Sequence, residues 1–160
     1  MSKKNKIGLD ASKCEVLAIG LNKLLASYQI YYMNLRGFHW NIAGEKFFEL
    51  HLKFEELYND SLVKIDEVAE RILTLGYQPV HAFSNYIKIS AIKETTNISD
   101  GKKAMKEVVS SLQALIEIER DLLALSSKAN DEGTNALMSD YIREQEKLVW
   151  MFTSYLGKKK

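Results

Sequence analysis

The chain has 160 residues, of which 46% are hydrophobic and 27% charged, with one proline and eight glycines. This length suits a single domain with a sizeable core, and the scarcity of helix breakers favours long helices. A formal net charge of +1 excludes a bulk electrostatic attraction to nucleic acid, so any such attraction must be local. Cys14 is the only cysteine, which excludes an intrachain disulfide.

The amino-terminal segment begins with lysines, as a signal peptide does. Asp10, Lys13 and Glu15 interrupt the apolar stretch that a signal peptide would need. No segment approaches the ~20 apolar residues of a membrane span. We therefore expect the protein in the cytoplasm, where an unpaired cysteine is common.

Two helices are predicted in the first half of the chain. In the first, apolar residues recur at alternating steps of four and three, at Leu17, Leu21, Leu24, Tyr28, Tyr31, Leu35 and Phe38. Gly37 is expected to mark its end. The second helix is expected to close at Leu75–Gly76, with Pro79 beyond it as a stop. Its apolar face consists of Phe47, Phe54, Tyr58, Leu62, Ile65, Ala69 and Ile72.

The second half predicts two more helices after a long connection, residues 77–97, in which residues 82–90 suit a short extra helix. The third long helix follows a cap region at Asn97 and Ser99 and precedes a loop at residues 126–135. The fourth is expected to end at Gly157. The chain thus predicts an all-α, ferritin-like four-helix bundle over residues 1–160, with short lysine-rich tails at 1–8 and 157–160.

The histidines bear on whether such a bundle holds metal in its centre. Ferritin-like sites use Glu-x-x-His motifs on two helices. The residues three places before His39, His51 and His81 contain no glutamate. A di-iron centre inside one bundle is therefore not expected.

The second predicted helix carries another set of ligand types: His51 with Glu55, and Asp66 with Glu70. At ~100° per residue all four lie on one flank, but His51 and Asp66 are ~22 Å apart along the axis, too far for one metal. Two such helices packed antiparallel about a two-fold axis would bring His51 of one beside Asp66 of the other. The residues near that axis would be Asn59, Leu62 and Val63.

Simpler interpretations remain open on spacing alone. Ion pairs would explain the three carboxylates, because Lys53, Lys64 and Arg71 lie nearby on the same predicted helix. His39 and Trp40, beside a glycine that ends a helix, would suit a packed corner. No role is predicted for His81.

Three segments resemble the Dps family, the miniature ferritins known as DNA-binding proteins from starved cells. They are NLRGFHWNIAGEKFFELHLKFEELYND, KIDEVAERILTLGYQP and GTNALMSDYIREQEKLVWMFTSYL, and the resemblance runs through nearly the whole chain. The first joins His39–Trp40 to His51 twelve positions later. The second contains the segment DEVAE, from Asp66 to Glu70.

The resemblance implies an iron site shared by two subunits. It makes His39 and His51 ligands from one subunit and Asp66 and Glu70 ligands from its two-fold partner, with Glu55 as an auxiliary carboxylate. It further implies that Fe(II) is oxidised, preferably by hydrogen peroxide, and stored as ferric mineral in a hollow dodecamer. Trp40 would lie near the iron and supply an electron. No haem is expected.

Two further features of the family are assigned less directly. Carboxylates near the turn between the last two long helices line an iron entry pore in family members, and Asp131 and Glu132 are the candidates here. DNA binding would rest on lysines at the two ends of the chain, whose simpler interpretation is solvated fraying. These residues are Lys3, Lys4, Lys6, Lys158, Lys159 and Lys160.

Two alternative functions remain at this stage. A bacterioferritin-like store would hold its iron inside one bundle, which the missing Glu-x-x-His motifs disfavour. A nucleoid-packing shell without ferroxidase activity would keep the assembly and the basic ends but would not consume peroxide with iron. Fe(II) and peroxide added without oxygen separate these possibilities.

Overall fold

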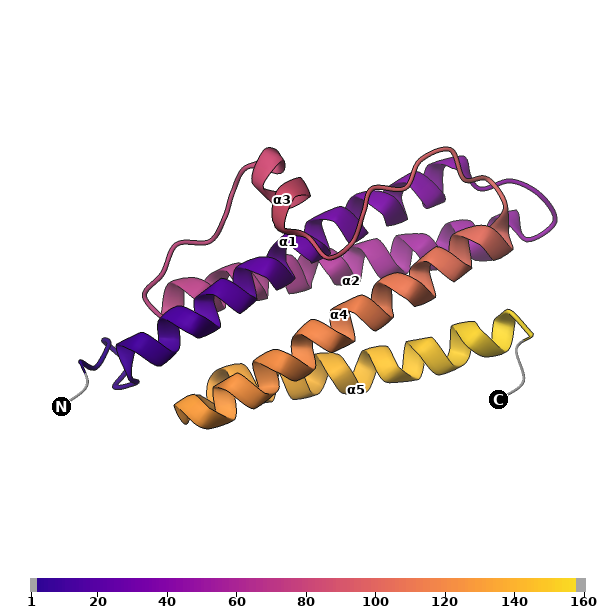
Figure 1. Ribbon diagram of the computed structural model, residues 1–160. Coiled ribbons are helices and arrows are strands. Elements are labelled where there is room, and N and C mark those ends of the chain that lie inside the picture. Colours follow the sequence, from indigo (N-terminus) through magenta and orange to yellow (C-terminus); the bar gives the residue numbers. More distant parts are fainter. Residues whose placement is uncertain (1–2, 158–160) are drawn as a thin grey trace.

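The computed structural model describes residues 3–157 and contains five helices (Figure 1). Their bounds are α1 Ala11–Asn41, α2 Phe47–Thr74, α3 Phe83–Ile89, α4 Gly101–Ala129 and α5 Glu132–Tyr155. Residues 3–157 contain no strand beyond an isolated bridge between Lys4 and Asp10. The four long helices form a bundle and α3 lies in the long connection, so the predicted all-α, ferritin-like architecture is confirmed.

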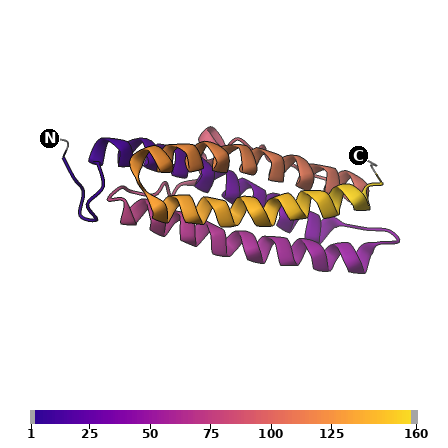
Figure 2. The same ribbon diagram turned by 90° about the horizontal axis from the view of Figure 1, so that it is seen from below.

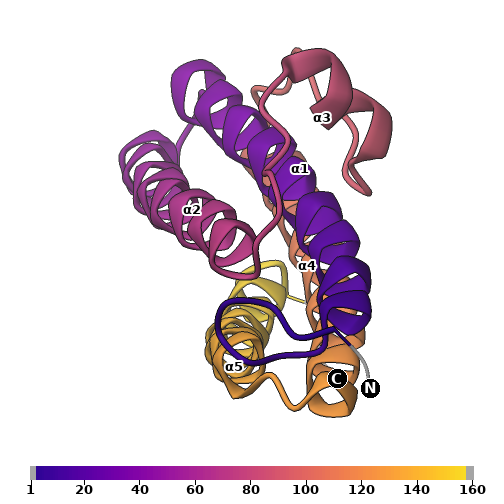
Figure 3. The same cartoon turned by 90° about the vertical axis from the view of Figure 1, so that its left-hand side faces the viewer.

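The bundle consists of two antiparallel helix pairs, α1 with α2 and α4 with α5, joined through contacts between α1 and α4 (Figures 1 and 2). Leucines of α1 fill the space between the pairs, and each fully buried leucine contributes ~1.5–3 kcal/mol. Those with no exposed surface are Leu17, Leu21, Leu24 and Leu35. Seen end-on, α2 lies at the edge of the bundle, so one of its faces has no helix of the same chain beside it (Figure 3).

Helix α1 continues through Gly37 and ends at Asn41, so the predicted end at Gly37 is wrong. A glycine inside a helix costs about 1 kcal/mol and does not by itself break it. Here Phe38 remains 3% exposed and continues the apolar stripe beyond the glycine. The turn instead uses Gly44, whose φ of 103° is readily adopted only by glycine. His39 is therefore a helical residue in the last turn of α1.

The connection between α4 and α5 is far tighter than the loop predicted at residues 126–135. Only Asn130 and Asp131 lie between the helices. Asn130 takes the left-handed conformation with φ 56°, and the Asp131 carboxylate accepts a hydrogen bond from the Thr134 amide. The polar residues before the turn remain helical, and the Ser126 and Ser127 hydroxyls find an acceptor within the helix by donating to the Leu123 carbonyl.

The long connection is bound to α1 by side-chain hydrogen bonds. Asn34 donates to the Lys93 carbonyl at 2.9 Å and accepts from the Thr95 amide at 2.9 Å. The cap of α4 is Asp100, which accepts from the Lys103 amide at 2.7 Å, and not Asn97 or Ser99. The expected short helix is confirmed as α3.

The described part of the amino-terminal segment is folded against the bundle. The Asn5 side chain donates to the Leu75 carbonyl at 3.2 Å and to the Cys14 sulfur at 3.4 Å. The Ala11 amide donates to the Lys3 carbonyl at 2.8 Å. Residues 3–8 are therefore held against the bundle by hydrogen bonds, whereas the sequence suggested a frayed tail. Among the described residues, no helix is long and apolar enough to cross a membrane.

The centre of the bundle holds a buried polar cluster, defined here as Tyr28, Glu119 and Gln145. Tyr28 donates to Glu119 Oε1 at 2.8 Å, and the Gln145 amide donates to the same oxygen at 2.8 Å. Burial raises the pKa of Glu119 to about 7, although the hydrogen bonds from Tyr28 and Gln145 act to lower it. Glu119 Oε2 and Gln145 Oε1 have no hydrogen-bond partner among the described residues.

Candidate metal centre

His39 and His51 lie together at the end of the α1–α2 pair and bind each other's backbone. The Nδ1 of His39 lies 2.7 Å from the His51 carbonyl oxygen, and the Nδ1 of His51 lies 2.7 Å from the His39 carbonyl oxygen. The rings are stacked, with centroids 3.7 Å apart and planes at 16°. The structure thus brings the two predicted histidines into one reciprocal pair.

The end of α1 provides one of the two carbonyl groups. The last carbonyls of a helix have no partner within the helix. The amide that would reach the His39 carbonyl belongs to Ala43, and this amide instead donates to the Ser99 carbonyl at 3.0 Å. The His39 oxygen is therefore available to His51. Ending α1 at Asn41 is thus part of how the histidine pair is built.

The reciprocal bonds fix the chemistry of both rings. Because a carbonyl only accepts hydrogen bonds, each Nδ1 must carry the proton, and each Nε2 keeps its lone pair. A histidine held through one nitrogen by a carbonyl is the usual arrangement of a metal ligand. His39 is 9% exposed, and the Phe47 ring stacks on His51 at 5.0 Å. The two contacts thus fix both rings and leave each Nε2 lone pair unused by them.

The three candidate carboxylates, Glu55, Asp66 and Glu70, have no ion pair or side-chain hydrogen bond within residues 3–157. The two lysines and the arginine that the sequence offered as ion-pair partners bind other acids. Lys53 pairs with Glu56, Lys64 with Asp60 and Glu144, and Arg71 with Asp131. These three basic side chains therefore form no ion pair with Glu55, Asp66 or Glu70. Three acids on one helix flank remain uncompensated in the single chain.

No three acidic, histidine or cysteine side chains converge as a metal site within the described part of one chain. This agrees with the ~22 Å that helix geometry places between His51 and Asp66. Exposed apolar residues occupy the same sector of α2 as the ligand candidates. They are Leu52, Leu62 and Val63, which are 56%, 51% and 58% exposed. An exposed apolar strip on a helix flank favours a protein contact there.

Next to the histidine pair lies a group of aromatic side chains, most of which the sequence had not marked as functional. The Tyr58 ring meets His39 edge-on at 5.3 Å, and Tyr32 meets Tyr58 at 6.0 Å. Trp40 is 57% exposed, and the Arg36 guanidinium lies 4.9 Å from its ring centroid. Trp40 directly follows His39 in the sequence, and its ring makes a cation–π contact with Arg36. The spacing of four residues from Tyr32 to Arg36 to Trp40 was the available sequence signal.

Comparisons with known proteins now decide the family. Residues 19–160 match the model of the ferritin-like domain. A Vibrio cholerae O1 structure described as a Dps protein of the ferritin-like diiron-carboxylate superfamily is 55% identical, with a TM-score of 0.95 over 98% of both chains. The DNA protection during starvation protein of Porphyromonas gingivalis is 44% identical over 94% of this chain and 95% of its own length. The chain belongs to the Dps family. An uncharacterized Haemophilus influenzae protein is 54% identical over 93% of each chain.

The two acids suggested for a Dps-type entry pore have different surroundings. Asp131 is 2% exposed, and its carboxylate binds Arg71 at 2.5 Å and the Thr134 hydroxyl at 2.5 Å. These contacts make it a structural cap that ties the α4–α5 turn to the end of α2. Gly133 fits beside it because a Cβ there would lie 2.7 Å from the Arg71 guanidinium. Glu132 is exposed and remains the pore candidate.

The basic residues suggested for DNA binding are only partly described. Lys3, Lys4 and Lys6 are exposed on the folded amino-terminal segment. Lys158, Lys159 and Lys160 lie outside the described residues. A local basic surface at the amino-terminal end is thus available in this Dps-family chain.

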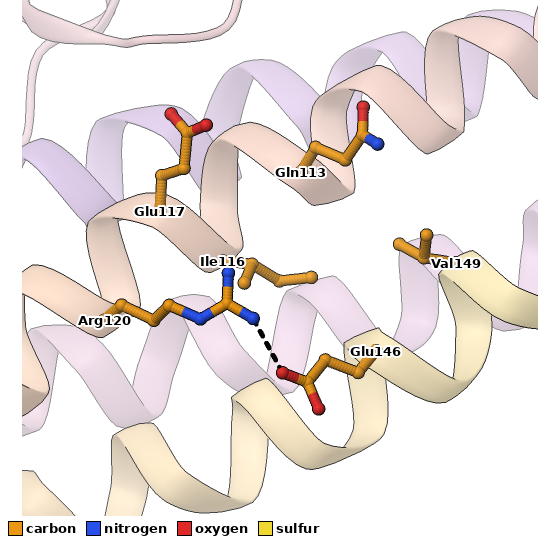
Figure 4. A pocket seen from close by; sticks show the side chains of 6 residues that line it. All are labelled: Gln113, Ile116, Glu117, Arg120, Glu146 and Val149. Carbon is orange, nitrogen blue, oxygen red and sulfur yellow. Dashed lines mark hydrogen bonds and ion pairs between the residues drawn. The ribbon is translucent and has the colours of Figure 1, made fainter.

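A groove lies between α4 and α5 (Figure 4). Arg120 binds Glu146 across it at 2.7 Å, and both side chains are more than half exposed. The residues lining the groove are Gln113, Ile116, Glu117, Arg120, Glu146 and Val149. It contains neither the paired histidines nor the uncompensated carboxylates, so its position gives no support to a second iron site.

Proposed function

We propose that this protein is a ferroxidase that oxidises Fe(II), preferably with hydrogen peroxide, at sites shared by two subunits, and stores the ferric product inside a hollow dodecamer. Membership of the Dps family supports the coarser role of iron storage and DNA protection. Two observations carry the finer proposal: His39 and His51 are held in a fixed tautomer, and three carboxylates on the flank of α2 lack any cation.

Each residue has a defined part in this proposal. The Nε2 atoms of His39 and His51 bind Fe(II) from one subunit, and Asp66 and Glu70 bind it from the partner subunit. Glu55 acts as an auxiliary carboxylate. Imidazole and carboxylate together suit Fe(II), and a sparse ligand set leaves positions open for the oxidant. Trp40 is proposed as an electron source beside the site.

The reaction consumes both reagents of hydroxyl-radical chemistry. Two Fe(II) ions supply the two electrons that break the O–O bond of one hydrogen peroxide, and two protons complete two water molecules. Glu132 is proposed to guide Fe(II) inward, because an exposed carboxylate at a helix end attracts cations. Removing Fe(II) and peroxide together protects nearby DNA. A cytoplasmic location belongs to the same proposal.

The site-sharing proposal is tested by mixing two inactive variants. One carries His39→Ala with His51→Ala, and the other Asp66→Ala with Glu70→Ala. After joint unfolding and reassembly, half of the randomly formed two-fold pairs are mixed, and each mixed pair regains one of two sites. About a quarter of the wild-type activity should therefore return if both subunits supply ligands. Activity is followed as ferric absorbance after Fe(II) and peroxide are added without oxygen.

Both variants must first form the wild-type assembly by sedimentation, because His39 is buried and its loss can disturb packing. A correctly assembled mixture with no more activity than its separate parts would contradict the shared site. A stable monomer that still oxidises iron would contradict the assembly as well.

Direct DNA binding is proposed only through the basic ends. Because Asn5 binds the body of the bundle, substitution of Lys3, Lys4 and Lys6 by glutamine is preferable to deletion. Combined with removal of residues 158–160, it should abolish DNA retention at low salt and leave iron oxidation intact. Phosphate contacts make such binding steeply salt-dependent, and many copies add avidity. DNA retention unchanged in this variant would exclude the lysines.

A further inference from the structure

We propose that Tyr58 and Tyr32 form a path that supplies one electron to the iron site, and that Arg36 holds this path in place. The inference rests on the proposed function, since it concerns peroxide reduction at the histidine pair. It adds a donor that serves when a site contains a single Fe(II). Tyr58 and Tyr32 are named below as the tyrosine path.

The first step of the path is a ring contact with a candidate ligand. Tyr58 meets His39 with ring centroids 5.3 Å apart and planes at 86°. Tyr32 meets Tyr58 with centroids 6.0 Å apart and planes at 83°. Both separations lie in the range of direct edge-to-face contact. The two phenols therefore form a continuous series of touching rings that begins at His39.

Arg36 fixes the geometry of this series. Its guanidinium lies 5.1 Å from the Tyr58 ring centroid and 5.5 Å from that of Tyr32. It also donates a hydrogen bond to the Tyr32 hydroxyl oxygen at 2.7 Å. Cation–π contacts of this kind contribute about 0.5–2 kcal/mol each and hold the rings in register. One side chain thus contacts both members of the path.

The same hydrogen bond makes Tyr32 the better site for a persistent radical. Its oxygen accepts from Arg36, so the phenolic proton is not used in that bond and can leave to solvent. Arg36 stays protonated, and it continues to donate to the oxygen after the proton has gone. Tyr32 is only partly buried, which gives its proton a route out. Within the described residues, Tyr58 has no comparable hydrogen-bond donor to its oxygen.

The redox step balances with peroxide as the oxidant. The O–O bond breaks with two electrons, one from Fe(II) and one from Tyr58. The phenolic proton of Tyr58 and one proton from solvent complete two water molecules. Fe(III) and a neutral Tyr58 phenoxyl remain. Tyr58 is then restored by an electron from Tyr32 and a proton from solvent, and Tyr32 releases its own proton. A single Fe(II) can thus reduce peroxide fully without releasing a hydroxyl radical.

The test uses the assembled protein with Tyr58→Phe, which keeps the ring and removes a hydroxyl that makes no hydrogen bond within the described residues. One Fe(II) per site is added without oxygen, followed by peroxide and rapid freezing. Electron paramagnetic resonance should show a tyrosyl radical in the wild type and its loss in the variant. A spin trap should report severalfold more hydroxyl radical from the variant. The rate of iron oxidation by the wild type with two Fe(II) per site, measured in parallel, tests the ferroxidase function itself.

Tyr77→Phe is the matched control, because Tyr77 binds the Ala11 carbonyl at the opposite end of α1. The rise of a helix places it roughly 40 Å from His39. This control should retain the wild-type radical. Tyr32→Phe should leave a radical on Tyr58 with an altered spectrum and a shorter lifetime.

The outcomes separate the two proposals. Wild-type protein that oxidises no iron overturns the ferroxidase function. Normal iron oxidation with no tyrosyl radical, or with a radical that persists unchanged in Tyr58→Phe, overturns the tyrosine path and leaves the ferroxidase function standing.

Discussion

The centre of the bundle and the outer face of the α1–α2 pair both hold polar side chains, but the side chains have opposite surroundings in the two regions. In the centre, Glu119 has no exposed surface and accepts hydrogen bonds from Tyr28 and Gln145 of the same chain. On the α1–α2 pair, the histidines at one end are held through Nδ1 with Nε2 unused, and Asp66 and Glu70, near the other end of α2, have no partner within residues 3–157.

The difference separates polar groups that serve the fold from polar groups without a structural partner. A buried acid is tolerated only with compensating hydrogen bonds, and the central cluster provides them. The uncompensated acids of α2 have no such structural benefit. Sites that break local rules in this way are where function is expected. The comparison predicts that substitutions at the two regions will affect different measurable properties.

The largest expected effect is on iron oxidation in Asp66→Ala with Glu70→Ala. Loss of these two proposed ligands should lower the activity by at least about 100-fold, since even outer-shell changes cost 10–100-fold. The free energy of unfolding should change by less than about 0.5 kcal/mol, because both side chains are exposed and unpaired. Ferric absorbance and urea unfolding of the same sample measure the two effects. Strong destabilisation with retained activity would reverse the comparison.

Glu119→Ala should show the opposite pattern. It leaves the Tyr28 hydroxyl and the Gln145 amide without their shared acceptor and opens a cavity at a position with no exposed surface. The free energy of unfolding should fall by roughly 2–4 kcal/mol. Iron oxidation by the assembled protein should stay within about twofold of wild type below the unfolding temperature, since no ligand is touched. An equally large loss of activity would connect the centre to the site.

Glu119→Gln sharpens the comparison through pH. The pKa of Glu119 is raised by burial from 4.5 to about 7, so folding favours the protonated acid. This stabilising contribution is fully present below about 4.5 and is lost as the pH rises through about 7. Relative to wild type, the glutamine variant should therefore gain roughly 2–3 kcal/mol between about pH 5 and about pH 8. Urea unfolding at fixed protein concentration measures it; parallel pH profiles for the two proteins would contradict it.

Arg120→Ala gives the smallest expected effect and serves as a reference for the changes in stability of the other variants. Its ion pair with Glu146 is 57% and 53% exposed, so solvent screens it. The free energy of unfolding should change by less than about 0.5 kcal/mol, with a weaker effect at high salt. Iron oxidation should not change, because the groove between α4 and α5 is separate from the histidine pair. A loss of iron oxidation would instead make this groove part of the iron pathway.

The sequence predicted the bundle well because apolar periodicity records which face of each helix is buried. It failed where a single residue type was given too much weight. Gly37 does not end α1, since burial of Phe38 offsets the cost of the glycine. The polar run before Asn130 is helical, and its serine hydroxyls are satisfied by the Leu123 carbonyl within the helix.

The candidate site was predictable only in part. Spacing along α2 placed His51, Asp66 and Glu70 on one flank. That His39 and His51 bind each other's carbonyls depends on where α1 ends and on Ser99 far along the chain, which no local pattern encodes. The tyrosine path was missed because Tyr58 belongs to the apolar stripe of α2, where an aromatic residue first suggests packing.

The reciprocal histidine bonds also bear on when the histidine pair forms during synthesis of the chain. Before α1 and α2 dock, neither imidazole has its carbonyl partner, and each ring is free to exchange its proton between the two nitrogens. The emerging chain therefore presents no organised pair until the two helices have folded together. A chain still on the ribosome thus lacks the ordered imidazoles on which the proposed iron site depends.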